Sequence, residues 1–300
     1  MSNKINSGIE STIHTLSKKE QLNFLLTNRI PRRWSTLFIG WFSQIQSPTL
    51  TKLSIWIWSK FAEDLRLQDA KKQSFNSLGE CFTRELKTGL RPITPHPEIV
   101  ASPCDAIVGA HGDIKGSKVF QAKGFPYDIS ELIPDIQLQQ KYQNGKFITL
   151  RLKSSMYHRF HAPVDCQVKH VSYISGDTWN VNPVALKRVE KLFCKNERAV
   201  VELVTGHPSS SITLVPVAAI LVASMKFSFL SDTLDLKYQG PNSLPCDASF
   251  NKGDEMGYFQ HGSTIILFAT ANYEFCEEIK NGSAIKMGQS LLRGHLTSFP

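Results

Sequence analysis

The sequence has little that would mark a metalloprotein, a repeat protein or a membrane-spanning protein. Its six cysteines occur singly, and it has no His-Glu-x-x-His motif, no internal repeat and no run of about 20 mainly apolar residues. Isolated cysteines in a chain of 300 residues are typical of buried thiols in a reducing compartment. The N-terminus lacks the apolar core of a secretory signal. What remains is a globular composition, long enough for a large core.

Acidic residues are scarce at the N-terminus. The chain has 34 Lys and Arg against 26 Asp and Glu, a formal net charge of +8. Residues 1–62 hold eight of the basic side chains and two of the acidic ones, so +6 of the net charge lies there. This predicts an acidic partner such as an anionic lipid or substrate. We expect no nucleic-acid partner, because the remaining chain is nearly neutral and shows no RNP-like or zinc-finger pattern.

Aromatic residues are concentrated in the same region. Residues 34–61 hold four of the five tryptophans together with three phenylalanines. They are Trp34, Trp41, Trp56, Trp58, Phe38, Phe42 and Phe61. Aromatic rings beside basic side chains favour a segment that lies in a membrane interface. The alternative is a helical hairpin folded onto its own domain.

The chain changes from a helical to a β pattern at a proline-rich stretch, residues 92–97. Apolar residues at steps of three and four predict a helix within residues 62–93. Beyond residue 98, short segments rich in β-branched residues predict mostly antiparallel strands. These segments are 146–152, 167–173, 199–204, 212–222 and 263–269. The expected class is α+β, with a helical, membrane-associating N-terminal part before a β-rich catalytic domain.

A Gly-Ser-Thr sequence precedes the last of these strands. The hydroxyl of Ser263 can attack the carbonyl of Gly262, where the absence of a Cβ lessens crowding. Loss of the Ser263 Cα proton would then eliminate the ester, and hydrolysis of the resulting dehydroalanine gives a pyruvoyl group. Taken alone, the motif is also an ordinary turn that enters a strand.

Two further motifs offer acid–base groups. His158 and His161 flank Arg159, so they could supply a general base, a proton donor and an anion clamp. A zinc site is less well supported because no third ligand is evident. Asp105 follows a proline turn and could orient an imidazole, although a turn-stabilising role explains this residue better when it is taken alone.

In the order Asp, His, Ser, these motifs resemble those of the phosphatidylserine decarboxylase family, whose members are self-cleaving, pyruvoyl-dependent proenzymes. The resemblance runs from about Phe75 to the C-terminus. Further matching stretches are 121–124, 144–152, 176–177, 180–182, 196–198, 253–257 and 286–289.

The resemblance implies a role for each motif. Ser263 would be the nucleophile that cleaves the bond after Gly262, and it would become the covalent pyruvoyl group. His161 would activate Ser263, and Asp105 would orient His161. His158 would act in the decarboxylation step. The products of cleavage would be chains 1–262 and 263–300.

The resemblance also implies the reaction and its setting. Phosphatidylserine would form a Schiff base with the pyruvoyl group and leave as phosphatidylethanolamine, with no metal and no pyridoxal phosphate. Residues 1–75 would associate with an anionic phospholipid membrane, and residues 76–300 would form the decarboxylase domain. We expect a homodimer, bound peripherally to the cytoplasmic face of the cell membrane.

Three positions depart from the family pattern. Ala106 stands where the family usually has Gly, Met156 where it often has Asp, and His261 where it usually has Leu or Gly. Ala106 and His261 leave room for a lipid-binding relative that does not process itself. The sequence also allows a pyruvoyl-dependent decarboxylase of a soluble amino acid or a serine hydrolase, although the Gly-x-Ser-x-Gly elbow of many hydrolases is missing.

Overall fold

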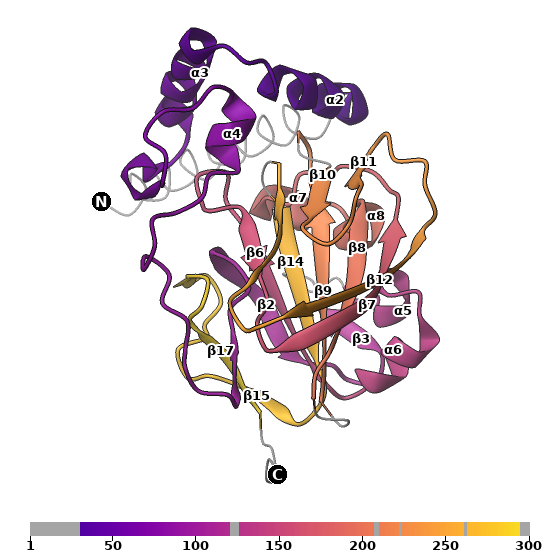
Figure 1. Ribbon diagram of the computed structural model, residues 1–300. Helices are drawn as coiled ribbons and strands as arrows, with labels where there is room; N and C mark the ends of the chain where they lie inside the picture. The colour runs from indigo at the N-terminus through magenta and orange to yellow at the C-terminus, as the bar shows by residue number, and fades with distance from the viewer. Residues whose placement is uncertain (1–30, 121–125, 207–209, 222–223, 261–262, 295–300) are drawn as a thin grey trace, which may run out of the picture.

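The computed structural model describes residues 31–120, 126–206, 210–221, 224–260 and 263–294. Its centre is an eight-stranded sheet in which all neighbouring strands are antiparallel (Figure 1). In spatial order the strands are β12 (Ser243–Phe250), β7 (Cys166–Ile174), β8 (Arg198–Val204), β9 (Ser211–Ala218), β14 (Ser263–Ala269), β5 (Lys146–Arg151), β2 (Ala106–Asp113) and β16 (Ala284–Ile285). All five segments predicted as strands lie in this sheet, although β9 ends four residues earlier than expected.

Three smaller sheets surround the large one. The four-stranded sheet is formed by β11 (Thr233–Asp235), β10 (Ser224–Phe227), β13 (Glu255–Phe259) and β6 (Arg159–His161). The three-stranded sheet is formed by β1 (Ile99–Ala101), β17 (Ser290–Gly294) and β15 (Tyr273–Phe275). Strands β3 (Lys118–Phe120) and β4 (Pro126–Asp128) form a hairpin.

Both faces of the large sheet are covered, which explains its apolar central strands. Ile265 and Leu267 of β14 belong to a core shared with Phe160 of the four-stranded sheet. Ile266 and Phe268 point to the other face and pack with the short helices there. These helices are α5 (Ile129–Leu132), α6 (Ile136–Lys141), α7 (Pro183–Leu186) and α8 (Leu192–Lys195). Burial on two faces favours a continuous apolar strand over an alternating one.

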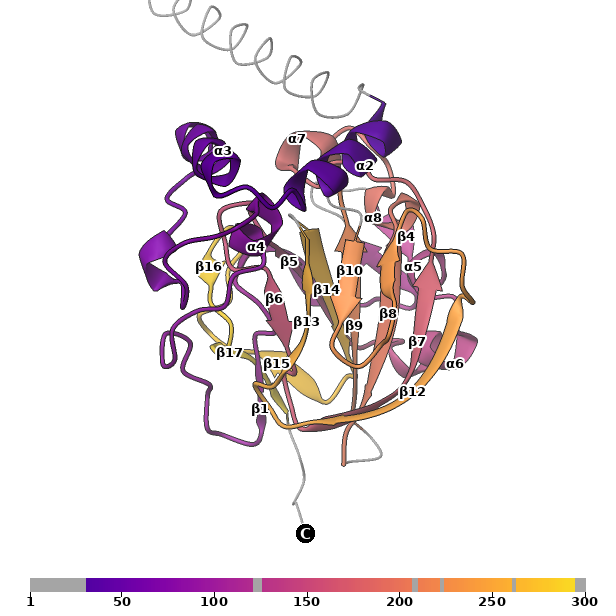
Figure 2. The ribbon, with the colours of Figure 1, turned by 45° about the horizontal axis from the view of Figure 1, so that its top comes forward.

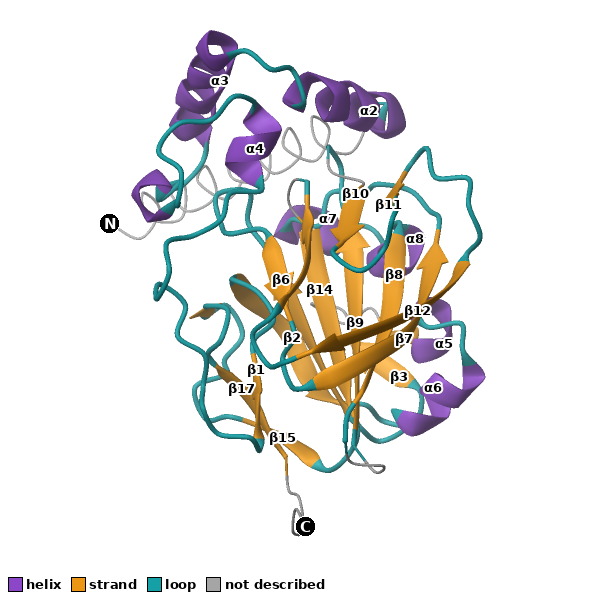
Figure 3. Cartoon of the chain, viewed as in Figure 1, coloured by secondary structure: helices purple, strands orange, loops and turns teal. Residues whose placement is uncertain are grey.

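The N-terminal helices gather at one end of the sheets (Figures 1 and 2). They are α2 (Arg32–Ser43), α3 (Pro48–Phe61), the 3-10 turn η1 (Leu67–Asp69) and α4 (Leu78–Phe82). Of the helices in the described ranges, none has the length and apolar character needed to cross a membrane. Figure 3 shows these helices set apart from the strands, so the predicted α+β class is confirmed.

The helix predicted within residues 62–93 is mostly wrong. Only η1 and α4 are helical there, and α4 begins where the side chain of Ser77 caps the backbone N–H of Glu80. Beyond α4 the backbone pairs with an earlier segment instead, because Lys71 N–H donates to the carbonyl of Glu85 at 2.9 Å. Tertiary pairing overrides the local helical periodicity.

Candidate functional site

The strand register brings Asp105 and Ser263 to the same edge of the large sheet. Arg151, the last residue of β5, lies opposite Ile107 of β2 on one side and Thr264 of β14 on the other. Because β2 and β14 are both antiparallel to β5, they begin at the same edge. Asp105 and Ser263 therefore stand at the starts of two strands that flank one strand.

The two histidines reach this edge from β6. The backbone N–H of His161 donates to the carbonyl of Pro103 at 2.8 Å, two residues before Asp105. The carbonyl of His158 accepts from the N–H of Phe259 at 3.0 Å, four residues before Ser263. The structure thus gathers all three motifs, although they are up to 158 positions apart in the sequence.

Ser263 presents a buried hydroxyl. Its side chain is fully buried, and Oγ has no hydrogen-bond partner within the described part of the chain. The carbonyl of Ser263 accepts from Leu152 N–H at 2.9 Å, so the backbone is held while the hydroxyl is not. A buried hydroxyl without a partner costs roughly 1–3 kcal/mol. Thr264 Oγ1 shares this condition.

His161 is built as a neutral imidazole. Its Nδ1 lies 2.8 Å from the carbonyl of Gly253, which can only accept, so Nδ1 carries the proton. Nε2 then accepts from the hydroxyl of Tyr157 at 3.0 Å. Burial lowers the pKa of His161, against the opposing effect of the Gly253 carbonyl. His161 therefore has a lone pair on Nε2 at neutral pH, as a general base requires.

Asp105 makes strong contacts, but they are not with His161. Its carboxylate forms a bidentate pair with Arg91, with Arg91 Nε at 2.7 Å, and it accepts from Met287 N–H at 2.9 Å. In the described structure, the hydrogen bond that orients the His161 ring is therefore made with Gly253 and not with Asp105. The roles expected of Asp105, His161 and Ser263 stay predictions.

His158 lies on the side of the N-terminal helices. Its Nδ1 donates to the carbonyl of Met156 at 2.7 Å, which directs the lone pair to Nε2. Its ring centroid is 4.1 Å from that of Phe82 in α4, and Phe82 stacks in turn on Trp58 of α3 at 5.4 Å. The helices therefore contact a predicted catalytic residue through aromatic rings.

A cavity of about 860 Å³ opens beside Ser263. Leu152, which donates to the Ser263 carbonyl, lines it, as does Ala219, which follows the register partner of Ser263. Trp58 and Phe82 form an apolar wall on the helix side. Cavities that hold small molecules are of this size and are mostly apolar with a few polar groups.

Sequence reasoning assigned no role to three groups of the candidate site. Arg151 and Lys153 line the cavity, and Gly253 holds His161. Lys153 is ion-paired with Glu63 at 2.7 Å. Only the position of Arg151, at the end of a predicted strand that precedes the histidine motif, was a usable signal.

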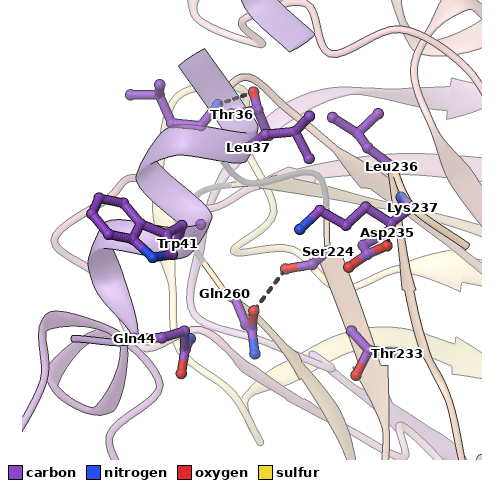
Figure 4. Close-up of a pocket in the computed structure, with 12 residues that line it drawn as sticks. Thr36, Leu37, Trp41, Gln44, Ser224, Thr233, Asp235, Leu236, Lys237 and Gln260 are labelled. Atoms are coloured by element: carbon purple, nitrogen blue, oxygen red, sulfur yellow. Dashed lines mark hydrogen bonds between the residues drawn. The ribbon is translucent and has the colours of Figure 1, made fainter. Parts of the chain in front are cut away.

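A second, smaller cavity of about 360 Å³ separates α2 from the four-stranded sheet (Figure 4). Helix α2 is fixed there, because Thr36 Oγ1 accepts from Leu221 N–H at 2.9 Å. Arg32 also pairs with Asp177 at 2.6 Å. Gln260, three residues before Ser263, lines this cavity and accepts from Ser224 Oγ at 3.1 Å.

Some predictions fall outside the described residues. Gly262 and His261, on the N-terminal side of the expected cleavage, are two of them, and the first 30 residues of the basic region are others. Among the residues that are described, no group of three or more His, Cys, Asp or Glu side chains is arranged to hold a metal ion. All six cysteines are free thiols, three of them buried.

Comparisons with known proteins agree on one family. A model of the phosphatidylserine decarboxylase family matches residues 78–293. A phosphatidylserine decarboxylase proenzyme of Brevibacillus brevis is 32% identical over 271 residues, which cover 89% of this chain and 95% of the relative. The proenzyme of Vibrio parahaemolyticus is 33% identical over 271 residues, with 86% and 94% covered. That of Idiomarina loihiensis is 32% identical over 286 residues, with 91% and 97% covered. The chain belongs to the phosphatidylserine decarboxylase family.

Proposed function

We propose that this protein is a proenzyme that cleaves itself between Gly262 and Ser263 and then decarboxylates phosphatidylserine to phosphatidylethanolamine. The observation that carries the proposal is the buried hydroxyl of Ser263. It has no partner among the described residues, and it stands beside a large cavity at the edge where His158, His161 and Asp105 gather. The names of the relatives, all proenzymes of this activity, support it.

The first step would use the side chains of His161, Tyr157 and Ser263. The neutral imidazole of His161 is a base with its lone pair on Nε2, and Tyr157, which donates to that nitrogen, can relay a proton. The unpartnered Ser263 hydroxyl can rotate toward the preceding carbonyl without giving up a hydrogen bond among the described residues. Its buried position would also keep water from competing as the nucleophile.

Ser263 fits a covalent pyruvoyl group, because its Cβ would become the methyl group and its hydroxyl makes no hydrogen bond among the described residues that would be lost. Such a group supplies the electron sink that an amino-acid decarboxylation needs and that ordinary side chains cannot provide. The chain's own residues would bind and orient the substrate. His158, which is buried against Phe82 of the cavity wall, would hold or return a proton at the reacting carbon.

The N-terminal helices would bring the cavity to a bilayer. Trp34 and Phe61 are 76% and 87% exposed, and they belong to a set of exposed apolar residues on α2 and α3. The whole set is Trp34, Phe38, Trp41, Leu53, Trp56, Ile57 and Phe61. Rings and aliphatic side chains that face outward next to basic residues fit the interface of an anionic leaflet. We infer peripheral binding to the cytoplasmic face of the cell membrane, and we keep the homodimer as a prediction.

Intact-mass analysis and a vesicle assay together test the proposal. Two polypeptides are expected, the smaller beginning at position 263 with a blocked keto terminus, and carbon dioxide should be released from phosphatidylserine vesicles. A single uncut chain without activity would leave a lipid-binding relative. Turnover of free serine but not of vesicles would assign a soluble substrate. Labelling of Ser263 by a fluorophosphonate would assign a hydrolase.

A further inference from the structure

The cavity beside Ser263 carries an unbalanced positive charge. Three charged residues line it, namely Glu63, Arg151 and Lys153. The ammonium of Lys153 contacts both carboxylate oxygens of Glu63, at 2.7 and 2.9 Å, so those two charges largely compensate each other. The side chain of Arg151 makes no hydrogen bond and no ion pair with any residue that the structure describes. The lining therefore has a net charge close to +1, centred on Arg151.

Arg151 is also held away from bulk water. Its side chain is half-buried at the end of β5, and burial lowers its pKa, an effect that the more distant Glu63 opposes. Guanidinium stays charged under these conditions. A partly desolvated guanidinium without a partner is costly unless a ligand supplies an anion. The cavity thus has a preference for an anionic group at this point.

The distance between Arg151 and Ser263 limits how far apart the two groups of the ligand that they contact can be. Arg151 lies opposite Thr264, the residue that follows Ser263, on the neighbouring strand. Neighbouring strands are about 4.8 Å apart. In the headgroup of phosphatidylserine, only two carbons and an oxygen separate the amine from the phosphorus. Arg151 shares the sheet face of Thr264, and the Ser263 side chain points to the other face. The keto carbon, however, would be the former Cα of Ser263, which lies within the sheet. A headgroup whose amine is attached at that carbon can therefore reach Arg151 with its phosphate.

We propose that Arg151 binds the phosphodiester of the lipid headgroup and so selects a phosphate ester as the substrate of this cavity. The inference rests on the proposed function, because it assigns the headgroup of that substrate. The carboxylate is a poorer partner for Arg151, since a cation bound to it would stabilise the substrate more than the transition state that loses it. The phosphodiester keeps its charge throughout the reaction, so an arginine bound to it lowers KM and leaves kcat unchanged.

A binding measurement tests this without the reaction. The probe is dihexanoyl phosphatidylmethanol below its micelle concentration, because it has a phosphodiester but neither an amine nor a carboxylate. Calorimetric titration of the processed enzyme should show binding that Arg151→Gln weakens about tenfold or more, as expected for a lost charge-assisted hydrogen bond. The affinity of Arg151→Lys for the probe should lie between those of the unmodified protein and Arg151→Gln. Arg293→Gln, at an exposed arginine on β17, is the matched control and should bind like the unmodified protein.

Kinetics in mixed micelles separate the two anions of the substrate. Arg151→Gln should raise KM for phosphatidylserine and the inhibition constant of phosphatidylethanolamine by the same factor, with kcat changed less than about twofold. A rise in KM alone would mean that Arg151 binds the carboxylate and would overturn the proposal. Inhibition by inorganic phosphate that depends on Arg151, while probe binding does not, would assign a free-phosphate site and overturn it as well.

Failure of this inference is distinguishable from failure of the proposed function. If Arg151→Gln is cleaved normally and binds the probe as tightly as the unmodified protein, the assignment of Arg151 is wrong although decarboxylation stands. If the unmodified protein releases no carbon dioxide, the proposed function is wrong. Probe binding that depends on Arg151 would then still support an anion site in this cavity. Cleavage into two chains, with an unchanged thermal unfolding midpoint, shows that each variant is folded.

Discussion

The N-terminal helices and the β-rich region use their apolar residues in opposite ways. In β14, every residue from Ser263 to Ala269 is buried, and the apolar side chains fill two cores. In α2 and α3, the buried side chains are the small polar ones, Thr36, Ser43 and Thr51. Most rings of the same helices face outward. A set of exposed apolar residues this extensive marks an interaction surface.

Hydrogen bonds from small polar side chains attach α2 and α3 to the rest of the protein, where buried apolar side chains attach the strands to one another. Thr51 donates its hydroxyl to the carbonyl of Asn76 at 3.0 Å, and Thr36 accepts from Leu221 N–H. Polar contacts of this kind hold the helices on the protein, while most of their aromatic side chains stay exposed and available to a membrane. The β-rich region has the opposite arrangement, and the buried hydroxyl at the start of β14 is the group on which the chemistry depends. Substitutions in the two regions should therefore have different consequences.

The largest effect is expected at Ser263 itself. Ser263→Ala removes the nucleophile, so the chain should stay uncut and inactive. Relative to the uncut precursor, it also removes a buried hydroxyl that has no partner in the described structure, so the free energy of unfolding should not fall below that of the precursor and should rise by up to about 1 kcal/mol. Denaturing electrophoresis and thermal unfolding measure both. Cleavage of the Ser263→Ala chain would exclude Ser263 as the nucleophile.

The next effect compares two phenylalanines from the two regions. Phe268 of β14 is fully buried, and Phe268→Ala should cost about 3–5 kcal/mol of folding free energy. Phe61 at the end of α3 is exposed, and Phe61→Ala should change it by less than about 0.5 kcal/mol. Both substitutions are made in Ser263→Ala, which should stay a single chain, and the free energy of unfolding is measured in urea. Similar losses in both variants would mean that α3 is packed against the protein in solution.

The sequence predicts the two regions unequally well, for a physical reason. Strands such as β5 and β14 have β-branched residues and are buried on both faces, so composition alone identifies them. The helix predicted around Leu86 does not form because the backbone of Leu86 pairs with that of Ala70. Local periodicity carries no information about this long-range contact.

The candidate site shows the same division. Its residue types are visible in the sequence, but their partners are not. Arg91 pairs with Asp105 and Gly253 with His161, across 14 and 92 positions. Those contacts exist only once the sheets have formed, so no motif contains them.

Replacing the outward rings should separate membrane binding from chemistry. A variant with Trp34, Phe38, Trp41 and Trp56 all changed to Ser should bind phosphatidylserine vesicles at least about a hundredfold more weakly, because each ring contributes to interfacial partitioning. Turnover of a soluble serine analogue should be nearly unchanged. Co-sedimentation and carbon dioxide release are the two readouts. Ile136→Ser is the control, since this exposed isoleucine lies on α6. Equal losses in both assays would mean that the rings support the fold.

An effect that depends on pH is expected at Glu197, a carboxyl buried in the β-rich region. Burial, helped by the charge of Asp235, raises its pKa from 4.5 to about 8. The folded protein therefore keeps a proton that the unfolded chain loses above pH 4.5, so the free energy of unfolding should fall as the pH rises toward about 8.

Glu197→Gln removes this titration and keeps an acceptor for the hydroxyl of Tyr173, which donates to the carboxyl. Relative to the unmodified protein, it should be nearly neutral around pH 5 and should become more stable by roughly 1.4 kcal/mol for each pH unit up to about pH 8. Glu190→Gln, at an exposed carboxyl between α7 and α8, should show no such dependence. Parallel pH profiles for the unmodified protein and Glu197→Gln would mean that Glu197 is charged in the folded protein. Its burial would then need a cation from outside the described residues.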